Sequence, residues 1–177
     1  MDPLWNNIFR KKLDEDSLAY FLKHLAIFLE LSPRALRILE DIVHIRNYNA
    51  NETVFEEGDP GSGMYMIRSG MVKIYARDQK GIENELAHLS PGDFFGETTL
   101  TAPAPRSASA RTTETTELVG LFRADILELA ERHPAISSSI LFGLTRVVSE
   151  RLQAASLEIR RLQNLTGEHI SPENVET

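Results

Sequence analysis

The chain has 177 residues, of which 42% are hydrophobic and 25% charged, and these values suit one globular domain with its own core. A net charge of −7 argues against a nucleic-acid-binding surface, which needs clustered Lys and Arg. The lack of cysteine excludes disulfides, thiolate-bound iron–sulfur clusters and cysteine nucleophiles. No apolar run reaches membrane-spanning length and the N-terminus lacks a signal-peptide pattern, so a cytoplasmic location is expected.

Residues 1–46 are expected to form an N-terminal helical segment, because apolar residues recur there at helical spacing. Ser32 followed by Pro33 predicts a further helix start, since Ser caps a helix and Pro suits its first position. Packing helices are the simpler interpretation, and a partner-binding face on the first stripe is the alternative. The first stripe comprises Leu4, Trp5, Ile8 and Phe9, and the second comprises Leu18, Phe21, Leu22, Leu25 and Leu29.

Residues 47–122 alternate short β-type segments with clusters of turn residues. This spacing is typical of an antiparallel sandwich or barrel rather than of a βαβ fold. The expected strands lie at residues 54–55, 64–67, 72–75, 85–89 and 112–122.

Residues 123–165 return to a helical period, with a first helix ending near residues 133–134 and a long one from about 137 to about 165. The apolar steps of the long helix alternate between three and four residues, which predicts a homodimer through one seam. The alternative is a helix packed wholly on its own domain. Residues 166–177 are polar and are expected to form a disordered tail. The seam comprises Leu141, Leu144, Val148, Leu152, Ala155, Ile159 and Leu162.

Residues 95–108 combine side chains suited to a ligand with one phosphate and one sugar hydroxyl. Gly96 lets a ligand approach the backbone and tolerates a positive φ. Arg106 supplies a planar cation that binds two phosphate oxygens at once, and Ser107 adds a hydroxyl donor. Glu97 would repel a phosphate, so it fits only as an acceptor for a hydroxyl such as a ribose 2′-OH. The alternative is a surface loop in which Glu97 and Arg106 pair in solvent.

Two motifs resemble the cyclic nucleotide-binding domain shared by the bacterial catabolite activator protein group, protein kinase regulatory subunits and nucleotide-gated channels. The resemblance covers roughly residues 27–160. It implies an α+β fold: an antiparallel, jelly-roll-like β-roll with N-terminal helices, a short helix within a phosphate-binding cassette (residues 95–108) and a long C-terminal helix. The first motif is Gly58-Asp59-Pro60-Gly61, Met64-Tyr65-Met66-Ile67 and Gly70, and the second runs from Leu89 to Glu97, then Leu100 and Arg106-Ser107-Ala108.

The resemblance implies that the ligand is cAMP, with cGMP as the alternative, and that no metal is involved. By the family pattern, Glu97 would accept the ribose 2′-OH, Gly96 and the backbone after it would meet the cyclic phosphate, and Arg106 would neutralise that phosphate. The implied ligand-binding residues are Gly96, Glu97, Thr98, Thr99, Arg106, Ser107 and Ala108.

The chain departs from the family pattern at three places. Thr98 and Thr99 stand where the family has an apolar residue and then Ala, Gly or Ser; Thr99 either crowds the phosphate or adds a hydroxyl donor. Phe55 replaces the usual Ile, Val or Cys and is expected to alter packing only. The chain also ends after its long helix, without the helix-turn-helix of the transcription factors, so direct DNA binding is not expected.

The leading hypothesis is a stand-alone, non-enzymatic sensor of a cyclic nucleotide that acts on an unknown effector protein. Ligand binding would draw the cassette and the long helix together, because only differential affinity for two arrangements moves an equilibrium. Arg146 and Arg151 lie on that helix, where either one stacks on the purine or both are solvated surface residues.

Three alternatives remain open from the residues. A haem or other small-ligand sensor on the same roll requires an axial ligand. A barrel enzyme with a histidine-bound metal requires several converging ligands, and the strand region offers only His88. A roll that has lost its ligand would serve as a dimer scaffold. The histidines available are His24, His44, His88, His133 and His169.

Overall fold

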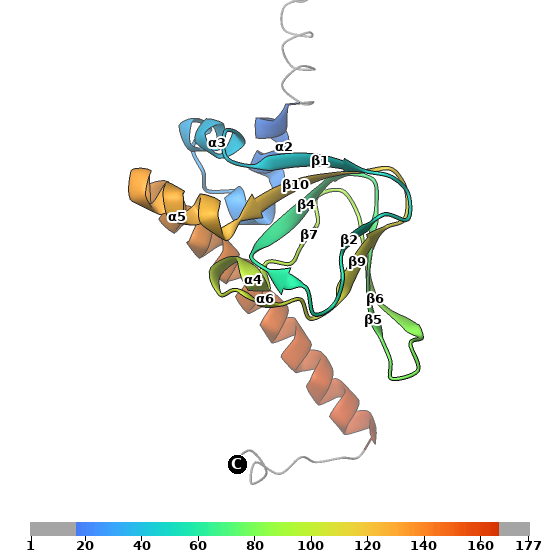
Figure 1. The fold of residues 1–177 in the computed structure, drawn as a ribbon. Helices are drawn as coiled ribbons and strands as arrows, with labels where there is room; N and C mark the ends of the chain where they lie inside the picture. The colour runs from blue at the N-terminus through green and yellow to red at the C-terminus, as the bar shows by residue number, and fades with distance from the viewer. Residues whose placement is uncertain (1–16, 167–177) are drawn as a thin grey trace, which may run out of the picture.

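The chain, described over residues 17–166 by a computed structural model, forms a β-roll with helices gathered at one end (Figure 1). The predicted α+β class and β-roll are confirmed. The predictions for Leu4, Trp5, Ile8 and Phe9, and for the tail after Thr166, lie outside the described residues. The helices are α2 (Leu18–His24), the 3-10 helix η1 (Ala26–Phe28), α3 (Pro33–Glu40), α4 (Thr98–Thr101), α5 (Arg123–Arg132) and α6 (Pro134–Thr166).

Two four-stranded antiparallel sheets and one two-stranded sheet build the roll. Their strand orders are β1-β10-β4-β7, β2-β9-β5-β6 and β3-β8. The strands are β1 (His44–Tyr48), β2 (Thr53–Phe55), β3 (Pro60–Gly61), β4 (Gly63–Ser69), β5 (Val72–Arg77), β6 (Glu83–Leu89), β7 (Phe94–Phe95), β8 (Ala104–Pro105), β9 (Ser109–Thr112) and β10 (Thr116–Phe122).

The alternating segments of the sequence correspond to β2, β4, β5, β6 and β10. Four further strands, β1, β3, β7 and β8, were not predicted, and β9 lies almost wholly before the expected segment. β1 begins at His44, before residue 47, where the roll was expected to start. The predicted helix start is confirmed, because the Ala35 amide donates to Ser32 Oγ at 3.2 Å and Pro33 is the first helical residue.

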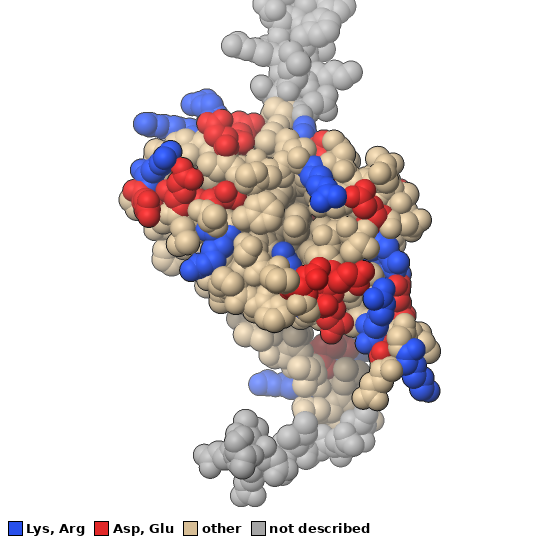
Figure 2. Space-filling model, in the orientation of Figure 1, with Lys and Arg blue, Asp and Glu red and all other residues tan. Residues whose placement is uncertain are grey.

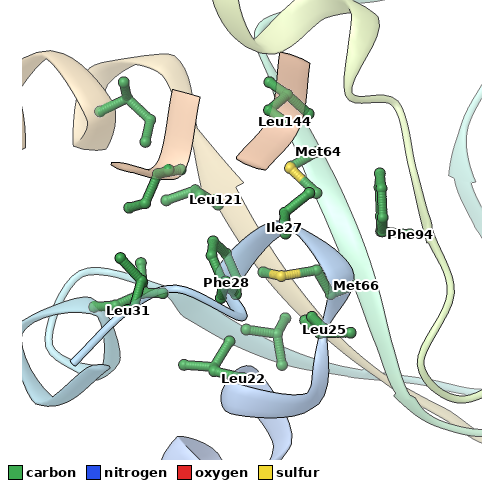
Figure 3. Close-up of a cluster of buried hydrophobic side chains, with 14 of the residues drawn as sticks. Leu22, Leu25, Ile27, Phe28, Leu31, Met64, Met66, Phe94, Leu121 and Leu144 are labelled. Carbon is green, nitrogen blue, oxygen red and sulfur yellow. The ribbon is translucent and has the colours of Figure 1, made fainter. Parts of the chain in front are cut away.

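The main hydrophobic core joins the N-terminal helices, one sheet of the roll and α6 (Figure 3). Leu22 and Phe28 from the N-terminal segment meet Met64 from β4, Leu121 from β10 and Leu144 from α6, all of them buried. A second cluster fills the roll beside the cassette. Its buried members are Tyr48, Ile67, Val72, Phe95, Ala110 and Leu118.

The first half of α6 packs against η1. A Cβ at Gly143 would lie 2.1 Å from the Ile27 carbonyl oxygen, so only glycine permits this approach. Arg146 reinforces the contact, because it donates to the Ala26 carbonyl at 2.7 Å and to Glu30 Oε1 at 2.9 Å. Arg146 is therefore held at η1.

The structure corrects part of the predicted seam on α6. Leu144 is only 6% exposed and Leu141 packs against the same core, so both stabilise their own domain. Farther along the helix Leu152 is 66% exposed and Ile159 56%. The part of the seam that a partner can reach thus begins at Val148. No helix within residues 17–166 has both the length and the apolar character needed to cross a membrane.

Candidate functional site

The predicted site residues line one pocket of about 190 Å³ between β7, α4 and the start of β9. β7 leads directly into the cassette, and β8 returns the chain to Arg106. Three inward-facing residues of the roll complete the wall: Phe55, Ile74 and Phe95. The cassette residues in the lining are Gly96, Glu97, Thr98, Thr99, Arg106, Ser107 and Ala108.

Gly96 forms the turn between β7 and α4. Its φ of +76° lies in the left-handed region, which glycine adopts without strain. A Cβ at this position would also lie 2.5 Å from Arg106 Nη1. Gly96 therefore allows both the turn and the close approach of the guanidinium.

Arg106 is a buried cation that uses only one side of its planar guanidinium within the protein. The side chain is 6% exposed, and Nη1 donates to the Gly63 carbonyl at 2.8 Å and to Thr99 Oγ1 at 2.9 Å. Nη1 also lies 3.2 Å from the Gly96 carbonyl. Nε is buried and has no partner among residues 17–166. Because Nε and Nη2 form one edge of the fork, that edge can donate to two oxygens of one anion.

The electrostatics of Arg106 also favour an anion. Burial lowers the pKa of its guanidinium, and Tyr65 and Asp59 oppose that shift. A guanidinium stays protonated at neutral pH, so the buried charge persists. No carboxylate of the described chain forms an ion pair with Arg106. A buried cation without a counter-ion is costly, and an anionic ligand would offset that cost.

Thr99 and Phe55, two residues that depart from the family pattern, contact Arg106. The Thr99 hydroxyl accepts from Nη1 and lies 3.1 Å from the Gly96 carbonyl, to which it donates. The Phe55 ring centroid lies 4.2 Å from Arg106 Cζ, at cation–π distance. The expectation that Phe55 alters packing only is therefore wrong, because its ring also contacts the guanidinium.

Glu97 is linked to the C-terminal helix. Arg151 of α6 donates from Nη1 to Glu97 Oε1 at 2.8 Å and from Nη2 to the Phe94 carbonyl at 3.3 Å. The Arg151 guanidinium also lies 4.4 Å from the Phe94 ring centroid. Glu97 is the less exposed partner, at 12% against 46% for Arg151. The predicted hydroxyl acceptor thus already has a cationic partner on α6.

Comparison with known families agrees with this geometry. Residues 45–133, half of the chain, match the family described as "Cyclic nucleotide-binding domain". The chain belongs to the cyclic nucleotide-binding domain family. The matched range includes the whole cassette and ends at the junction of α5 and α6.

Curated relatives include bacterial receptors and kinase subunits. The chain is 35% identical to the "Cyclic AMP receptor protein" of Thermus thermophilus, over 78% of this chain and 62% of that protein. It is 33% identical to the "cAMP-dependent protein kinase regulatory subunit" of Colletotrichum orbiculare, over 63% of this chain and 27% of that protein. The chain thus spans about three-fifths or less of these two relatives.

Solved structures of the family have the same roll. The Thermus thermophilus catabolite activator protein superposes with a TM-score of 0.70 at 35% identity, over 78% of this chain and 63% of that one. A cyclic nucleotide-binding domain from Methylobacillus flagellatus gives a TM-score of 0.72 at 20% identity, over 92% and 87%. The second likeness concerns the fold alone. The regulatory domain of Toxoplasma gondii PKA, solved with cAMP, gives a TM-score of 0.59 at 25% identity, over 66% and 44%.

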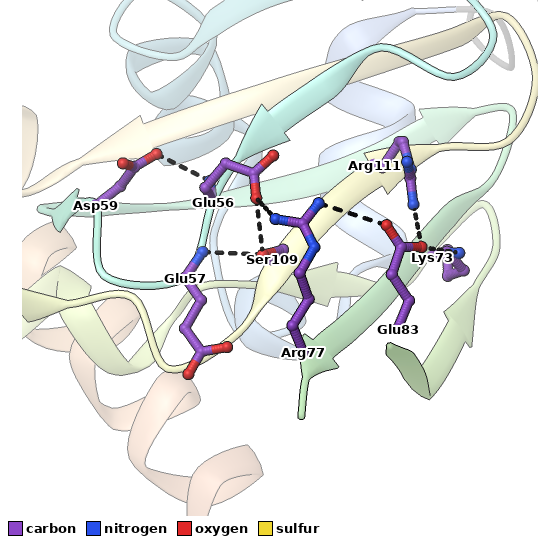
Figure 4. A network of polar contacts seen from close by, with 8 residues as sticks. All are labelled: Glu56, Glu57, Asp59, Lys73, Arg77, Glu83, Ser109 and Arg111. Atoms are coloured by element: carbon purple, nitrogen blue, oxygen red, sulfur yellow. Dashed lines mark hydrogen bonds and ion pairs between the residues drawn. The ribbon is translucent and has the colours of Figure 1, made fainter. Parts of the chain in front are cut away.

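A polar network joins β5, β6 and β9 to the loop after β2 (Figure 4). Glu83 pairs with Lys73 at 2.9 Å and with Arg111, and its second oxygen lies 3.5 Å from Arg77. Arg77 extends the network to Glu56 at 3.2 Å. From there the loop before β3 reaches the cassette: the Glu57 amide donates to Ser109 Oγ, the Arg106 amide to the Asp59 carbonyl, and the Gly58 amide to the Arg106 carbonyl.

A larger hollow of about 600 Å³ lies beside α2, outside the cassette of this domain. Its walls include Tyr20, Phe21 and Pro91, together with the Arg68–Glu117 ion pair. The smaller cassette pocket is the better candidate, because it is lined by an arginine without an ion-pair partner in residues 17–166, a carboxylate and three hydroxyl-bearing side chains. The face of the domain in Figure 2 carries interspersed acidic and basic side chains without a broad basic patch.

The four histidines within residues 17–166 lie outside the candidate pocket. His44 contacts Asp125, His88 lies near Glu85, and His24 contacts the Tyr20 carbonyl. Over residues 17–166, no three His, Asp or Glu side chains are grouped to hold a metal ion.

Replacing Glu83 tests whether its ion pairs stabilise the fold, because their contribution to stability depends on pH. Its hydrogen bonds with Lys73 and Arg111 hold the pKa of the Glu83 carboxyl below its ordinary 4.5. A lowered pKa stabilises the fold fully above pH 4.5, and that contribution is lost as pH falls through the folded-state value. Glu83→Gln should therefore unfold at a lower temperature than the parent at pH 7, with a gap that narrows below pH 4.5.

Thermal unfolding followed by circular dichroism at pH 7, 5 and 3.5 measures this difference. Glu114→Gln, at an exposed turn position, is the control and should follow the parent at every pH. A pH-independent gap for Glu83→Gln would contradict the assigned role of its charge.

Proposed function

We propose that this chain is a non-catalytic regulatory module that binds a 3′,5′-cyclic nucleotide, with cAMP preferred and cGMP as the alternative. The observation that carries the proposal is a buried Arg106 whose Nε has no hydrogen-bond partner within residues 17–166, in a pocket that Glu97 also lines. In this arrangement the cyclic phosphate accepts from Arg106. The ribose 2′-OH donates to Glu97, and Ser107 and Ala108 line the phosphate end.

The preference for cAMP rests on the relatives. The Thermus protein is named for cyclic AMP, the Colletotrichum protein for cAMP-dependent kinase regulation, and the Toxoplasma domain was solved with cAMP. Ser107 beside the phosphate position is compatible with either base. Direct comparison of the two nucleotides is therefore part of the test.

We further propose that the ligand signals through α6. In this proposal the ribose hydroxyl donates to Glu97 Oε1, the oxygen that accepts from Arg151 in this structure. A nucleotide that takes this oxygen displaces Arg151 and weakens the contact between α6 and the cassette. Competition for one acceptor gives the ligand different affinities for the two arrangements of α6, which is the condition for a population shift.

A homodimer through the outer half of α6 completes the proposal. The apolar face there is exposed in the single chain: Leu152 is 66% and Ile159 56% exposed. The spacing of these residues matches a coiled-coil seam, and water exposure of such a stripe is unfavourable. The proposed contact residues are Val148, Leu152, Ala155, Ile159 and Leu162.

Calorimetric titration with cAMP and cGMP tests the ligand and its base preference together. The parent should bind cAMP more tightly than cGMP. Arg106→Ala should weaken cAMP binding by a hundredfold or more, since a charge-assisted bidentate contact contributes about 3 kcal/mol. Arg123→Ala, which removes an arginine bonded to the Thr101 carbonyl, is the matched control and should bind as the parent does. A parent that binds neither nucleotide would refute the proposed function.

Arg151→Ala tests the competition at Glu97. Loss of a partly exposed ion pair is worth up to about 1 kcal/mol, so cAMP binding should tighten by up to about fivefold. Binding of 2′-deoxy-cAMP, which has no hydroxyl to compete, should stay unchanged. Amide hydrogen exchange around residue 151 should rise on cAMP binding in the parent only. Weaker cAMP binding by the variant would instead mean that Arg151 assists the ligand.

The dimer is tested by sedimentation velocity. Leu152→Glu places a charge in the middle of the proposed seam and should convert the parent dimer to a monomer, because a buried unpaired carboxylate is costly. Glu150→Gln, on an exposed position nearby, should remain dimeric. A monomeric parent, or a dimeric Leu152→Glu variant, would contradict the seam.

A further inference from the structure

Thr99 and Phe55 are two departures from the family pattern that meet at one side chain. Thr99 is 3% exposed, and its hydroxyl lies 2.9 Å from Arg106 Nη1. The Phe55 ring covers the same guanidinium at 4.2 Å. The two residues are distant in sequence and come from different elements, α4 and β2.

The Thr99 hydroxyl is fully used by the protein. Because it accepts from Arg106, its own hydrogen must go elsewhere, and the Gly96 and Gly63 carbonyls lie at 3.1 and 3.3 Å. The methyl group packs on the glycine beside it, since a Cβ at Gly61 would lie 2.7 Å from Thr99 Cγ2. Thr99 therefore neither crowds the phosphate position nor offers it a free donor.

The Thr99 contact uses one end of the guanidinium and leaves the other edge without a partner. Nη1 meets Thr99 Oγ1 and the Gly63 carbonyl, so the protein satisfies that end. The Nε–Nη2 edge is left for two oxygens of a ligand, and Nε has no partner in residues 17–166. Without the hydroxyl, rotation about the Nε–Cζ bond and tilting of the plane are less restricted.

Phe55 restricts the remaining freedom of the guanidinium, which is movement out of its plane. The ring is itself held in an aromatic group, with centroids 5.9 Å from Phe95 and 6.0 Å from Tyr65. Tyr65 and Phe95 in turn stack at 5.6 Å. An aliphatic residue at position 55 would fill space but offer no π face to the cation.

We propose that Thr99 and Phe55 are positioning residues that preorganise Arg106, so that its Nε–Nη2 edge faces the phosphate before the ligand arrives. The assignment rests on the cyclic-nucleotide function proposed above, because it specifies how that same site holds its anion. Preorganisation improves affinity by reducing the ordering cost at binding.

Thr99→Val keeps the side-chain shape and removes the hydroxyl, and Thr99→Ser keeps the hydroxyl. Thr99→Val should weaken cAMP binding about tenfold, the worth of one hydrogen bond to a charged group, while Thr99→Ser should stay within about threefold of the parent. Thr101→Val, at an exposed position of the same helix, is the matched control and should not change affinity. Equal affinity of Thr99→Val and parent would overturn the role of Thr99.

A double-mutant cycle shows whether Thr99 acts by positioning Arg106 or by maintaining the shape of the pocket. In an Arg106→Ala background, Thr99→Val should cause no further loss, because Thr99 acts through Arg106. The same tenfold loss in both backgrounds would overturn the proposal. Phe55→Leu, expected to weaken binding about fivefold, gives a second, independent cycle if Thr99→Val unfolds.

Nitrogen-15 NMR of the arginine side chains decides the question without any ligand. A held guanidinium gives separate Nη1 and Nη2 signals, and Arg106→Ala assigns them by their loss. The signals should be separate in the parent and in Thr99→Ser, and averaged in Thr99→Val. Averaged signals in the parent would overturn the proposal. If the parent binds neither nucleotide, the proposed function is refuted. The positioning of Arg106 is still tested, because the NMR measurement needs no nucleotide.

Discussion

The burial of Arg106 without a counter-ion is the constraint on which the rest of the site depends. Nη1 donates to Thr99 and to the Gly63 carbonyl, the Phe55 ring covers the guanidinium, and two glycines make room for this arrangement. Gly96 lets the guanidinium approach, and Gly61 leaves space for the Thr99 methyl. Small residues therefore surround the charge because larger ones would exclude either the guanidinium or its partners.

The same region of the chain connects the pocket to α6. Arg151 joins Glu97 and the Phe94 carbonyl, which flank the turn at Gly96. Before this point α6 is held by the core and by Gly143 against η1, whereas the side chains just after Arg151 are exposed. Arg151 thus marks the place where the helix leaves its own domain.

The sequence predicts the parts of this structure that depend on local pattern. The strands with alternating side chains, the Ser32 cap and the cassette residues that line the pocket are all recognisable from short stretches of sequence. Two-residue strands such as β3 and β7 have no period to detect. The apolar stripe of α6 is continuous, so its spacing alone could not separate Leu144, which is in the core, from Leu152, which is exposed. The Glu97–Arg151 pair joins residues 54 positions apart and required the fold.

The proposed function accounts for the position of Glu97, a carboxylate beside the proposed phosphate position. Beside a phosphate, an unpaired carboxylate would weaken binding by repulsion. Arg151 balances that charge in this structure, and a ribose hydroxyl can donate to the same oxygen when it displaces Arg151. A bare phosphate would place further negative charge next to Glu97, whereas a ribose hydroxyl is neutral. Under the proposed function, one ligand that carries both a phosphate and a hydroxyl satisfies the guanidinium and the carboxylate, and displacement of Arg151 from Glu97 would connect that binding to α6.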